Sequence, residues 1–548
     1  MRTYGDYKKI KLIMFVLILA ASLSVSIFYG VQKSGFHEDE YYTYYSSNRT
    51  YGLFQPDREW QDGQTILDEF AVREGEGFNY SLVKLVQSWD VHPPLYYFLF
   101  HTACSLVPGL FTKWTGIIVN LLGFCTAYLF LCLLMEEMNT PLWVEGLTLL
   151  FWGLNPQTVS CNMLIRMYAW LGAAVLACGY FHMKLLRDYD NNSLEVRSFV
   201  LKSLLPVAIT AFAGFLIQYF FIFFFFIIGF LTVCYIFFLR KDLKNALLYV
   251  AACMAGMIAA VAYYPASLHH MFGGYRGGDA SGSFFDIGNT MMRLSFFVGL
   301  LNDFVFAKGL LILVILIFLG VVLRMATENG VLRFADASKG VKLSKKDEGK
   351  KGPDVRIVIL TVASIGYFLM TCKTALLVGA ASNRYEMPIY SLLIYLIFLD
   401  VYYVIKSFEG NALYLAVAAV IVMLLIKGHV NDNNVLFLYP EDPEKITFAR
   451  ENNADQGCVA VVMFNPATPQ NVWRLTDELL EYDEVFYMDE ENLDAISDER
   501  VTSADRIILY AADDVLQREA FDNLLASTGK SAMTWQFSED MWCTYEVK

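Results

Sequence analysis

Long apolar segments, separated by short polar ones, recur along the chain as far as residue 427. They cover residues 12–29, 93–108, 115–135, 141–155, 163–183, 245–264, 307–323, 356–378, 387–405 and 411–427, with two more between 200 and 239. A helix of about 17–25 apolar residues is long enough to cross a bilayer. The pattern predicts a polytopic α-helical membrane protein with about 11 to 13 transmembrane helices, among which 141–155 and 288–301 are ambiguous.

Beyond residue 428 the pattern changes to that of a soluble domain. Residues 459–464, 484–487 and 506–510 are expected to form strands, and residues 471–482 and 515–526 are expected to form helices. This alternation predicts a small α/β domain at 429–548, after a membrane domain at 1–428. It has no glycine-rich phosphate loop, so we expect a role in binding or packing.

The composition agrees with a membrane protein, because 56% of the residues are hydrophobic and only 18% are charged. A soluble chain of this length would carry more charge and shorter apolar runs. The formal net charge of −13 at pH 7 argues against nucleic acid as a partner.

Lysine and arginine cluster in a few loops, and such loops face the cytoplasm in membrane proteins. The clusters lie around 184–202, 240–244 and 324–356. Counting crossings from them places the first loop (31–92), Arg166, Arg384 and the C-terminal domain on the exoplasmic side of the cell membrane. Three apolar runs lie between residues 92 and 160, although this orientation needs an even number of crossings. One of the three is therefore expected not to cross.

The first loop carries two groups of ionisable residues. Asp39 and Glu40 follow the first helix, and Asp90 and His92 precede Pro93-Pro94, where the next apolar run begins. Ionisable groups held at a membrane face indicate a functional site. A carboxylate can take the proton from an attacking hydroxyl, and a second one can orient the acceptor or bind a metal ion. The alternative interpretation is a solvated acidic loop followed by a helix that begins at the prolines.

The acid pair Asp39-Glu40 and the later hexapeptide DVHPPL at 90–95 together resemble the GT-C superfamily of membrane glycosyltransferases. Within it, they resemble the protein O-mannosyltransferase and aminoarabinose-transferase branch, which is glycosyltransferase family 39-like. This resemblance covers about residues 10–400 and implies a GT-C fold, a polyprenyl-phosphate-linked sugar donor and an exoplasmic active site. Within such an enzyme, we expect Asp39 to be the catalytic base and Glu40 to be its acceptor-orienting or metal-binding partner.

Looser matches extend the resemblance to later loops. The residues that it assigns to substrate binding are Asp90, His92, Arg166, Tyr168, Tyr275, Arg276, Arg384 and Tyr385. Arginine pairs well with phosphate, and its fixed charge would stabilise a departing polyprenyl phosphate. The sequence departs from the family pattern at Leu164, where an acid is common, and at Gln218, where a histidine is common.

A divalent metal ion is a further expectation, with Glu40, His269 and His270 as candidate ligands. Adjacent histidines point in different directions in regular structure, so at most one of the two would bind it.

The sequence thus predicts an inverting glycosyltransferase that moves a sugar from a polyprenyl-phosphate donor to a hydroxyl of a protein, lipid or glycan acceptor. One alternative is a transporter of a lipid-linked sugar or small molecule, which would favour ionisable residues at the bilayer midplane and inverted repeats. A receptor that binds a ligand through its C-terminal domain is another, but it leaves DVHPPL unexplained.

Overall fold

The computed structural model describes residues 4–49, 59–191, 196–328, 354–406, 411–430, 434–439, 443–489, 497–513, 517–539 and 541–548. Most of the basic loop expected at 324–356 lies outside these residues. The described chain divides into two compact units. The first comprises Met1–Val31, Asp90–Tyr96 and Gly116–Leu438, and the second comprises Gln32–Trp89, Tyr97–Thr115 and Tyr439–Lys548. The division cuts the first loop between Trp89 and Asp90.

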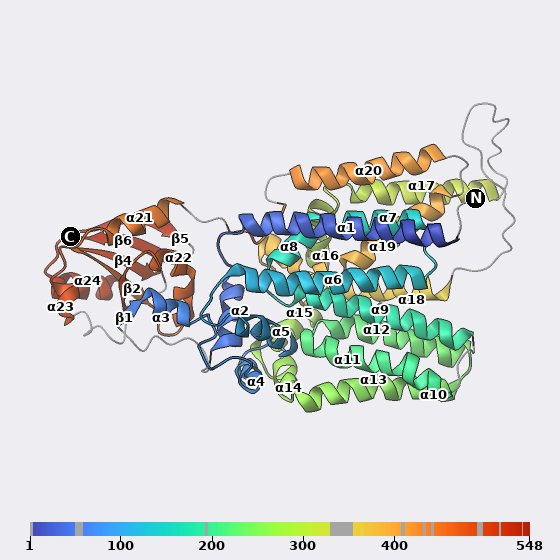
Figure 1. Cartoon of the computed structure of the whole chain (residues 1–548), viewed down its shortest axis with the longest axis horizontal. Coiled ribbons are helices and arrows are strands. Elements are labelled where there is room, and N and C mark those ends of the chain that lie inside the picture. Colours follow the sequence, from blue (N-terminus) through green and yellow to red (C-terminus); the bar gives the residue numbers. More distant parts are fainter. Residues whose placement is uncertain are drawn as a thin grey trace. The chain divides into compact units, whose positions relative to one another are not determined.

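The first unit is a bundle of long apolar helices (Figure 1). In chain order its elements are α1 (Tyr4–Gln32), α6 (Lys113–Glu137), α7 (Leu142–Gly153), α8 (Pro156–Met163), α9 (Tyr168–Asp190), α10 (Val196–Phe199), η1 (Val200–Leu204), α11 (Leu205–Ile217), α12 (Phe221–Cys234), η2 (Tyr235–Leu239), α13 (Leu243–Tyr263), α14 (Ala266–Phe272), α15 (Tyr275–Phe285), η3 (Ile287–Asn289), α16 (Thr290–Leu300), η4 (Leu301–Val305), α17 (Leu310–Glu328), α18 (Val355–Thr374), η5 (Gly379–Tyr385), α19 (Met387–Ile405) and α20 (Asn411–Val430).

Within the described residues, nine helices are long and apolar enough to cross a membrane, or up to ten if a pair bent by 99° counts as one span. The bent pair joins Ile287–Val305 to Leu310–Phe318. Of the three apolar runs between residues 92 and 160, only α6, with 25 residues, is among the nine. The other two form α5 (Leu95–Ser105) and α7, which have 11 and 12 residues. The predicted polytopic helical fold is confirmed, but the described residues hold fewer spanning helices than the 11 to 13 expected. Two of the three runs between 92 and 160, and not one, are too short to be among them.

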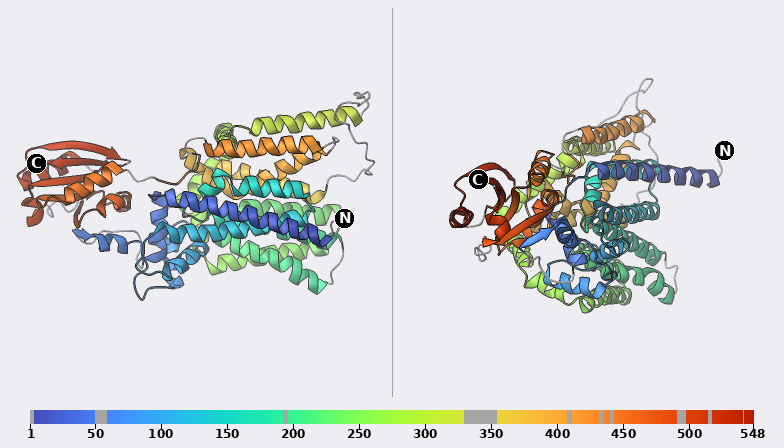
Figure 2. Two further views of the ribbon diagram at one scale, coloured as in Figure 1. Left: turned by 45° about the horizontal axis from the view of Figure 1, so that its top comes forward. Right: turned by 60° about the vertical axis from the view of Figure 1, so that its left-hand side comes forward.

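Polar contacts hold the bundle together at several levels. The helix α1 lies along α6 (Figure 2), and the Tyr128 hydroxyl donates to the Phe15 carbonyl at 2.8 Å. At one end of the bundle, Glu137 pairs with Arg187 at 2.6 Å and with Arg356 at 3.5 Å, which joins the ends of α6, α9 and α18. The loops at the opposite end carry Asp90, Arg166 and Arg384.

The second unit combines the first loop with the C-terminal part of the chain. Its helical elements are α2 (Glu38–Asn48), α3 (Gly63–Asp68), α4 (Tyr80–Trp89), most of α5, α21 (Pro443–Asn453), η6 (Pro469–Leu475), α22 (Thr476–Leu479), α23 (Glu499–Thr502) and α24 (Gln517–Thr528). Its strands are β1 (Trp60–Asp62), β2 (Cys458–Phe464), β3 (Glu484–Asp489), β4 (Arg506–Ala512), β5 (Met533–Glu539) and β6 (Trp542–Val547).

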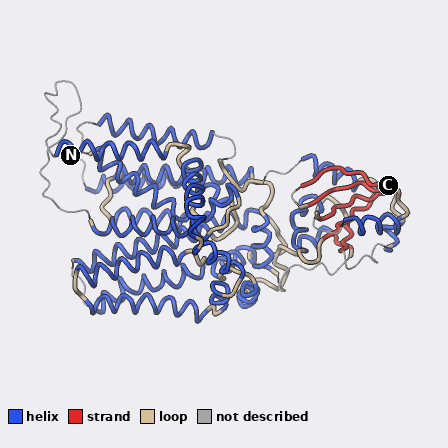
Figure 3. Tube along the Cα trace, turned by 180° about the vertical axis from the view of Figure 1, so that it is seen from behind, coloured by secondary structure: helices blue, strands red, loops and turns tan. Residues whose placement is uncertain are grey.

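These strands form one six-stranded sheet in the order β1-β3-β2-β4-β6-β5, drawn in red in Figure 3. The central strands β3, β2 and β4 are parallel, and their hydrophobic runs are buried as expected of a covered parallel sheet. The outer strands pair antiparallel. The first loop supplies the edge strand β1, in which Trp60 faces Phe486 and Asp62 faces Glu484. The predicted α/β domain is confirmed, with this strand added to it.

Candidate active site

Asp90, His92 and Arg166 form a continuous chain of contacts in the first unit. The Asp90 carboxylate lies 3.0 Å from Nδ1 of His92, and Nε2 of the same ring lies 3.1 Å from Nη2 of Arg166. A guanidinium only donates, so Nε2 accepts and the ring proton sits on Nδ1, where it is donated to Asp90. The carboxylate thus fixes the imidazole, and the imidazole fixes the arginine.

The two ends of this series of contacts, the Asp90 carboxylate and the Arg166 guanidinium, are both charged. Burial raises the pKa of the Asp90 carboxyl, but the contact with His92 and the charge of Arg166 outweigh it and hold the pKa below its usual value. A lowered pKa in the folded protein means that the contact is fully present above the ordinary carboxyl pKa of about 4. It is lost only as the pH falls through the lower value.

The Arg166 turn is held by its neighbours in the bundle. The side-chain amide of Asn120 donates to the Leu164 carbonyl at 2.5 Å, and the Tyr96 hydroxyl donates to the amide oxygen of Asn120 at 3.3 Å. Gly116 of α6 also packs against the turn so closely that a Cβ there would lie 2.2 Å from Cγ2 of Ile165. The loop before α5 and the loop before α9 are therefore locked together.

Two tyrosines border this chain. The Tyr264 hydroxyl donates to the His92 carbonyl at 3.3 Å, and the Tyr219 hydroxyl lies 2.9 Å from Nδ1 of His270. Burial, and then the nearby charge of Asp90, raise the pKa of Tyr219, so its hydroxyl keeps its proton. Neither tyrosine is among the substrate-binding residues that the sequence predicts. Gln218, in the place of the family's histidine, is buried and accepts a hydrogen bond from the N–H of Tyr219.

Arg384 lies in η5, immediately before α19. The guanidinium is buried, lies 5.1 Å from the centre of the Tyr385 ring and donates to its hydroxyl at 3.3 Å. The ring of Tyr168, the first residue of α9, packs edge-on against Tyr385 at 5.8 Å. The structure thus brings Tyr168, Arg384 and Tyr385 together, and Tyr168 follows Arg166 by two residues.

A network of buried amides supports η5, and the sequence pattern did not identify it as part of the site. The amide of Asn383 donates to Oε1 of Gln157 at 2.5 Å, and Asn383 also accepts from the Tyr390 hydroxyl. The amide of Gln157 in turn donates to the Asn434 carbonyl at 2.7 Å. Buried polar groups that satisfy one another fix a unique arrangement. The sequence does hold one indication of this network, because the amide residues Asn155, Gln157 and Asn383 lie beside long apolar runs.

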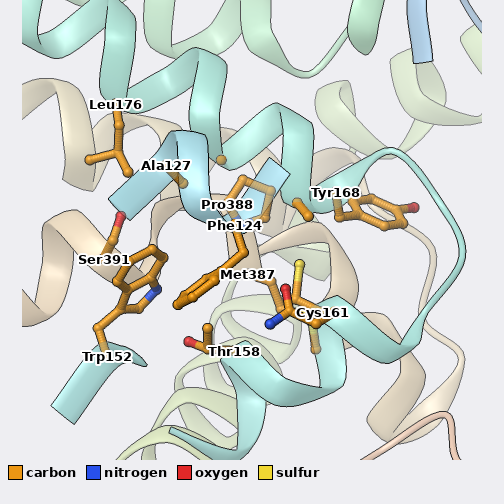
Figure 4. A pocket seen from close by; sticks show the side chains of 13 residues that line it. Phe124, Ala127, Trp152, Thr158, Cys161, Tyr168, Leu176, Met387, Pro388 and Ser391 are labelled. Atoms are coloured by element: carbon orange, nitrogen blue, oxygen red, sulfur yellow. The ribbon is translucent and has the colours of Figure 1, made fainter. Parts of the chain in front are cut away.

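A small pocket lies among α6, α7, α8, α9 and α19 (Figure 4). Its lining is mostly apolar, with a few hydroxyl and amide groups: Phe124, Ala127, Trp152, Thr158, Cys161, Asn162, Tyr168, Ala169, Gly172, Leu176, Met387, Pro388 and Ser391. Tyr168 and Met387 connect it to the turns that carry Arg166 and Arg384.

Asp39 and Glu40 lie in the first turn of α2, in the second unit, and differ in their surroundings. Glu40 is fully buried, and its Oε2 lies 2.9 Å from Nζ of Lys33, which is fully buried too. The same oxygen accepts a hydrogen bond of 2.6 Å from the N–H of His37, which completes a capping box. The side chain of Asp39 is 27% exposed. Of the two acids, Asp39 is the one that a substrate can reach.

A substitution of Glu40 should test the importance of this buried pair. We expect Glu40→Gln to lower the free energy of unfolding by about 3 kcal/mol or more, because glutamine cannot neutralise the buried ammonium of Lys33. Thermal unfolding of the purified protein measures the change. The matched control is Glu484→Gln, which breaks an ion pair with Arg500 whose side chains are 47% and 54% exposed. It should cost less than about 1 kcal/mol. Equal losses in the two variants would contradict the assignment.

The expected metal ligands do not form a suitable set. Among the described residues, no group of three or more His, Cys, Asp and Glu side chains could hold a metal ion. The carboxylate of Glu40 is occupied by Lys33, Nδ1 of His270 contacts Tyr219, and His269 is exposed. The residues present therefore do not fit the ion.

Two other expected binding residues lie on α15. Arg276 is exposed, and the side chain of Tyr275 lies outside the described part of the structure.

No protein-family model matches the sequence, and no curated protein matches it. Two solved structures are similar: ArnT from Cupriavidus metallidurans bound to undecaprenyl phosphate, with a TM-score of 0.46, and the same protein in the apo state, with a TM-score of 0.45. Each is 10% identical to this chain, over 97% of both chains. At this level of similarity, the function has to be argued from the residues of this chain.

Proposed function

We propose that this multi-pass membrane protein is an inverting glycosyltransferase of the GT-C type. It moves a sugar from a polyprenyl phosphate to the hydroxyl of an acceptor at the exoplasmic membrane face. Its sequence motifs DE at 39–40 and DVHPPL at 90–95 are those of the family that it resembles.

The observation that carries the proposal is the chain of contacts from Asp90 through His92 to Arg166. It holds a buried guanidinium in place through contacts within the protein. Such a preorganised charge is effective where negative charge develops in a transition state, because no reorganisation is needed. Arg384 is a second buried guanidinium in the same unit. A departing phosphate is the group that such arginines stabilise best.

Asp39 supplies the base in this proposal. Its carboxylate accepts the proton of the acceptor hydroxyl as the oxygen forms a bond to the anomeric carbon. The bond from that carbon to the phosphate oxygen breaks on the opposite face, and its electron pair leaves with the polyprenyl phosphate. One displacement inverts the anomeric configuration. Arg166 and Arg384 stabilise the charge on the leaving group.

Transfer by the purified protein in liposomes tests the proposal. A panel of polyprenyl-phosphate sugars, including undecaprenyl phosphate carriers, is offered with hydroxyl acceptors, and the products are identified by mass. We expect one donor to yield a glycosylated acceptor of inverted anomeric configuration. Movement of the intact lipid-linked sugar across the bilayer, without transfer by any donor, would overturn the proposal in favour of a transporter.

A further inference from the structure

The C-terminal part of the chain contacts the helix that carries Asp39. Arg474 of η6 forms an ion pair with Glu38, the first residue of α2. The ring of Trp473 lies 5.0 Å from the rings of both Tyr42 and Tyr45. Glu38, Tyr42 and Tyr45 are spaced by four and three residues, so they share one face of α2. All these residues belong to the second unit.

The segment just before α2, which includes Lys33 and Gly35, also contacts the C-terminal part of the chain. The N–H of Gly35 bonds to the carbonyl of Tyr439, and a Cβ on Gly35 would lie only 2.8 Å from that oxygen. Nζ of Lys33 lies 5.3 Å from the centre of the Tyr439 ring. A side chain at residue 35 would therefore displace the C-terminal segment from the start of α2.

A second attachment lies beyond α2. The edge strand β1 pairs with β3, the indole N–H of Trp60 donates to Asp498 at 3.0 Å, and the Arg500 guanidinium stacks on the Trp60 ring at 3.6 Å. The first loop is thus bound to the C-terminal domain at both α2 and β1.

Two of the three acids in the first turn of α2 are held by ion pairs. Successive residues of an α-helix point about 100° apart around its axis. Glu38 is held by Arg474 and Glu40 by Lys33, so both neighbours of Asp39 are anchored. These two pairs restrain the rotation of α2 about its axis, and Oδ2 of Asp39 lies 3.6 Å from Nδ1 of His37.

We propose that the C-terminal α/β domain is a positioning element of the transferase and that Arg474 and Trp473 orient α2 so that Asp39 meets the acceptor hydroxyl. This inference rests on the proposed function, in which Asp39 is the base. Glu38 and Arg474 are 34% and 24% exposed, and ion pairs so accessible to water contribute little to stability. The contact therefore acts mainly on orientation.

The test compares Arg474→Ala and Glu38→Gln in the full-length protein, with transfer measured at varied donor and acceptor concentrations. We expect kcat to fall about 10- to 100-fold in each, because a small displacement of a reacting group is costly. The KM for the donor should change little. The double variant should be no slower than either single variant, since both remove one contact. The exchanged pair Glu38→Arg with Arg474→Glu should recover part of the rate.

The matched control is Arg450→Ala, which breaks an ion pair with Glu481 at 2.9 Å elsewhere in the second unit. It should leave kcat unchanged. If Arg474→Ala unfolds at the assay temperature, Glu38→Gln and Trp473→Phe carry the comparison. One outcome would overturn the positioning role alone. In it, the Asp39→Asn enzyme is inactive, whereas the separate Arg474→Ala and Glu38→Gln enzymes are as fast as the Arg450→Ala control. An active Asp39→Asn enzyme would overturn the proposed function and this inference with it.

Discussion

An Asp39→Asn enzyme should fold normally and transfer sugar about 10²- to 10⁴-fold more slowly than the wild type. The amide has the shape of the carboxylate but cannot accept the proton of the acceptor hydroxyl. The substitution should leave the position of α2 unchanged, because the helix is anchored through Glu38 and Glu40 on either side of residue 39. Single-turnover transfer, with donor and acceptor saturating, measures the loss directly.

The control for this experiment is Glu74→Gln, a neutralised acid that lies exposed in the same first loop. It should retain the full rate, and both variants should unfold at the temperature of the wild type. An Asp39→Asn enzyme that transfers as fast as the Glu74→Gln enzyme would remove Asp39 from the mechanism.

Replacing Arg166 by glutamine should lower kcat about 10²- to 10³-fold, the usual cost of removing one preorganised donor from a developing negative charge. Lysine should restore little, because a single ammonium cannot both contact Nε2 of His92 and present a planar fork to a phosphate. Steady-state kinetics with a varied polyprenyl-phosphate sugar separate loss of turnover from loss of donor binding.

Asp90→Asn extends this experiment to the start of the contact chain. It should reduce the rate less than Arg166→Gln does, since the Arg166 guanidinium remains and only the contact between residue 90 and His92 is weakened. The matched control for Arg166→Gln is Arg240→Gln. The guanidinium of Arg240 is exposed, follows directly after η2 and pairs with Asp190, the last residue of α9. A loss of turnover in that control as large as in Arg166→Gln would show a general effect of removing an arginine.

The helices were predictable because the local pattern determines them. Most apolar runs became spanning helices, although 93–108 and 141–155 became the short helices α5 and α7. Residues 459–464 and 506–510 became β2 and β4 with small changes at their ends. The strand β1 was not predictable, because it has three residues and its partner lies more than four hundred residues later in the chain. The sequence also did not reveal β5 and β6, whose polar residues lack the apolar runs of the central strands.

The site shows the same limit. Asp90 and His92 lie two residues apart, so their contact could be expected from the sequence. The contact between His92 and Arg166 depends on how the turn before α9 packs against α6, which no local pattern encodes. Asp39 and Glu40 appeared equivalent as adjacent acids. Only the position of Lys33 distinguishes them, because it takes Glu40 into a buried ion pair.

The pairing of β1 with β3 has a consequence for the order in which the protein matures. At about 5–20 residues per second, a ribosome needs some 20 to 80 s to make the roughly 420 residues between the two strands. During that time the bundle helices can enter the membrane, while β3, the partner of the edge strand β1, has not yet been made. A three-residue strand offers few unpaired backbone groups to a neighbouring chain during this wait. The sheet can then close late, after synthesis is nearly complete, with little risk of aggregation.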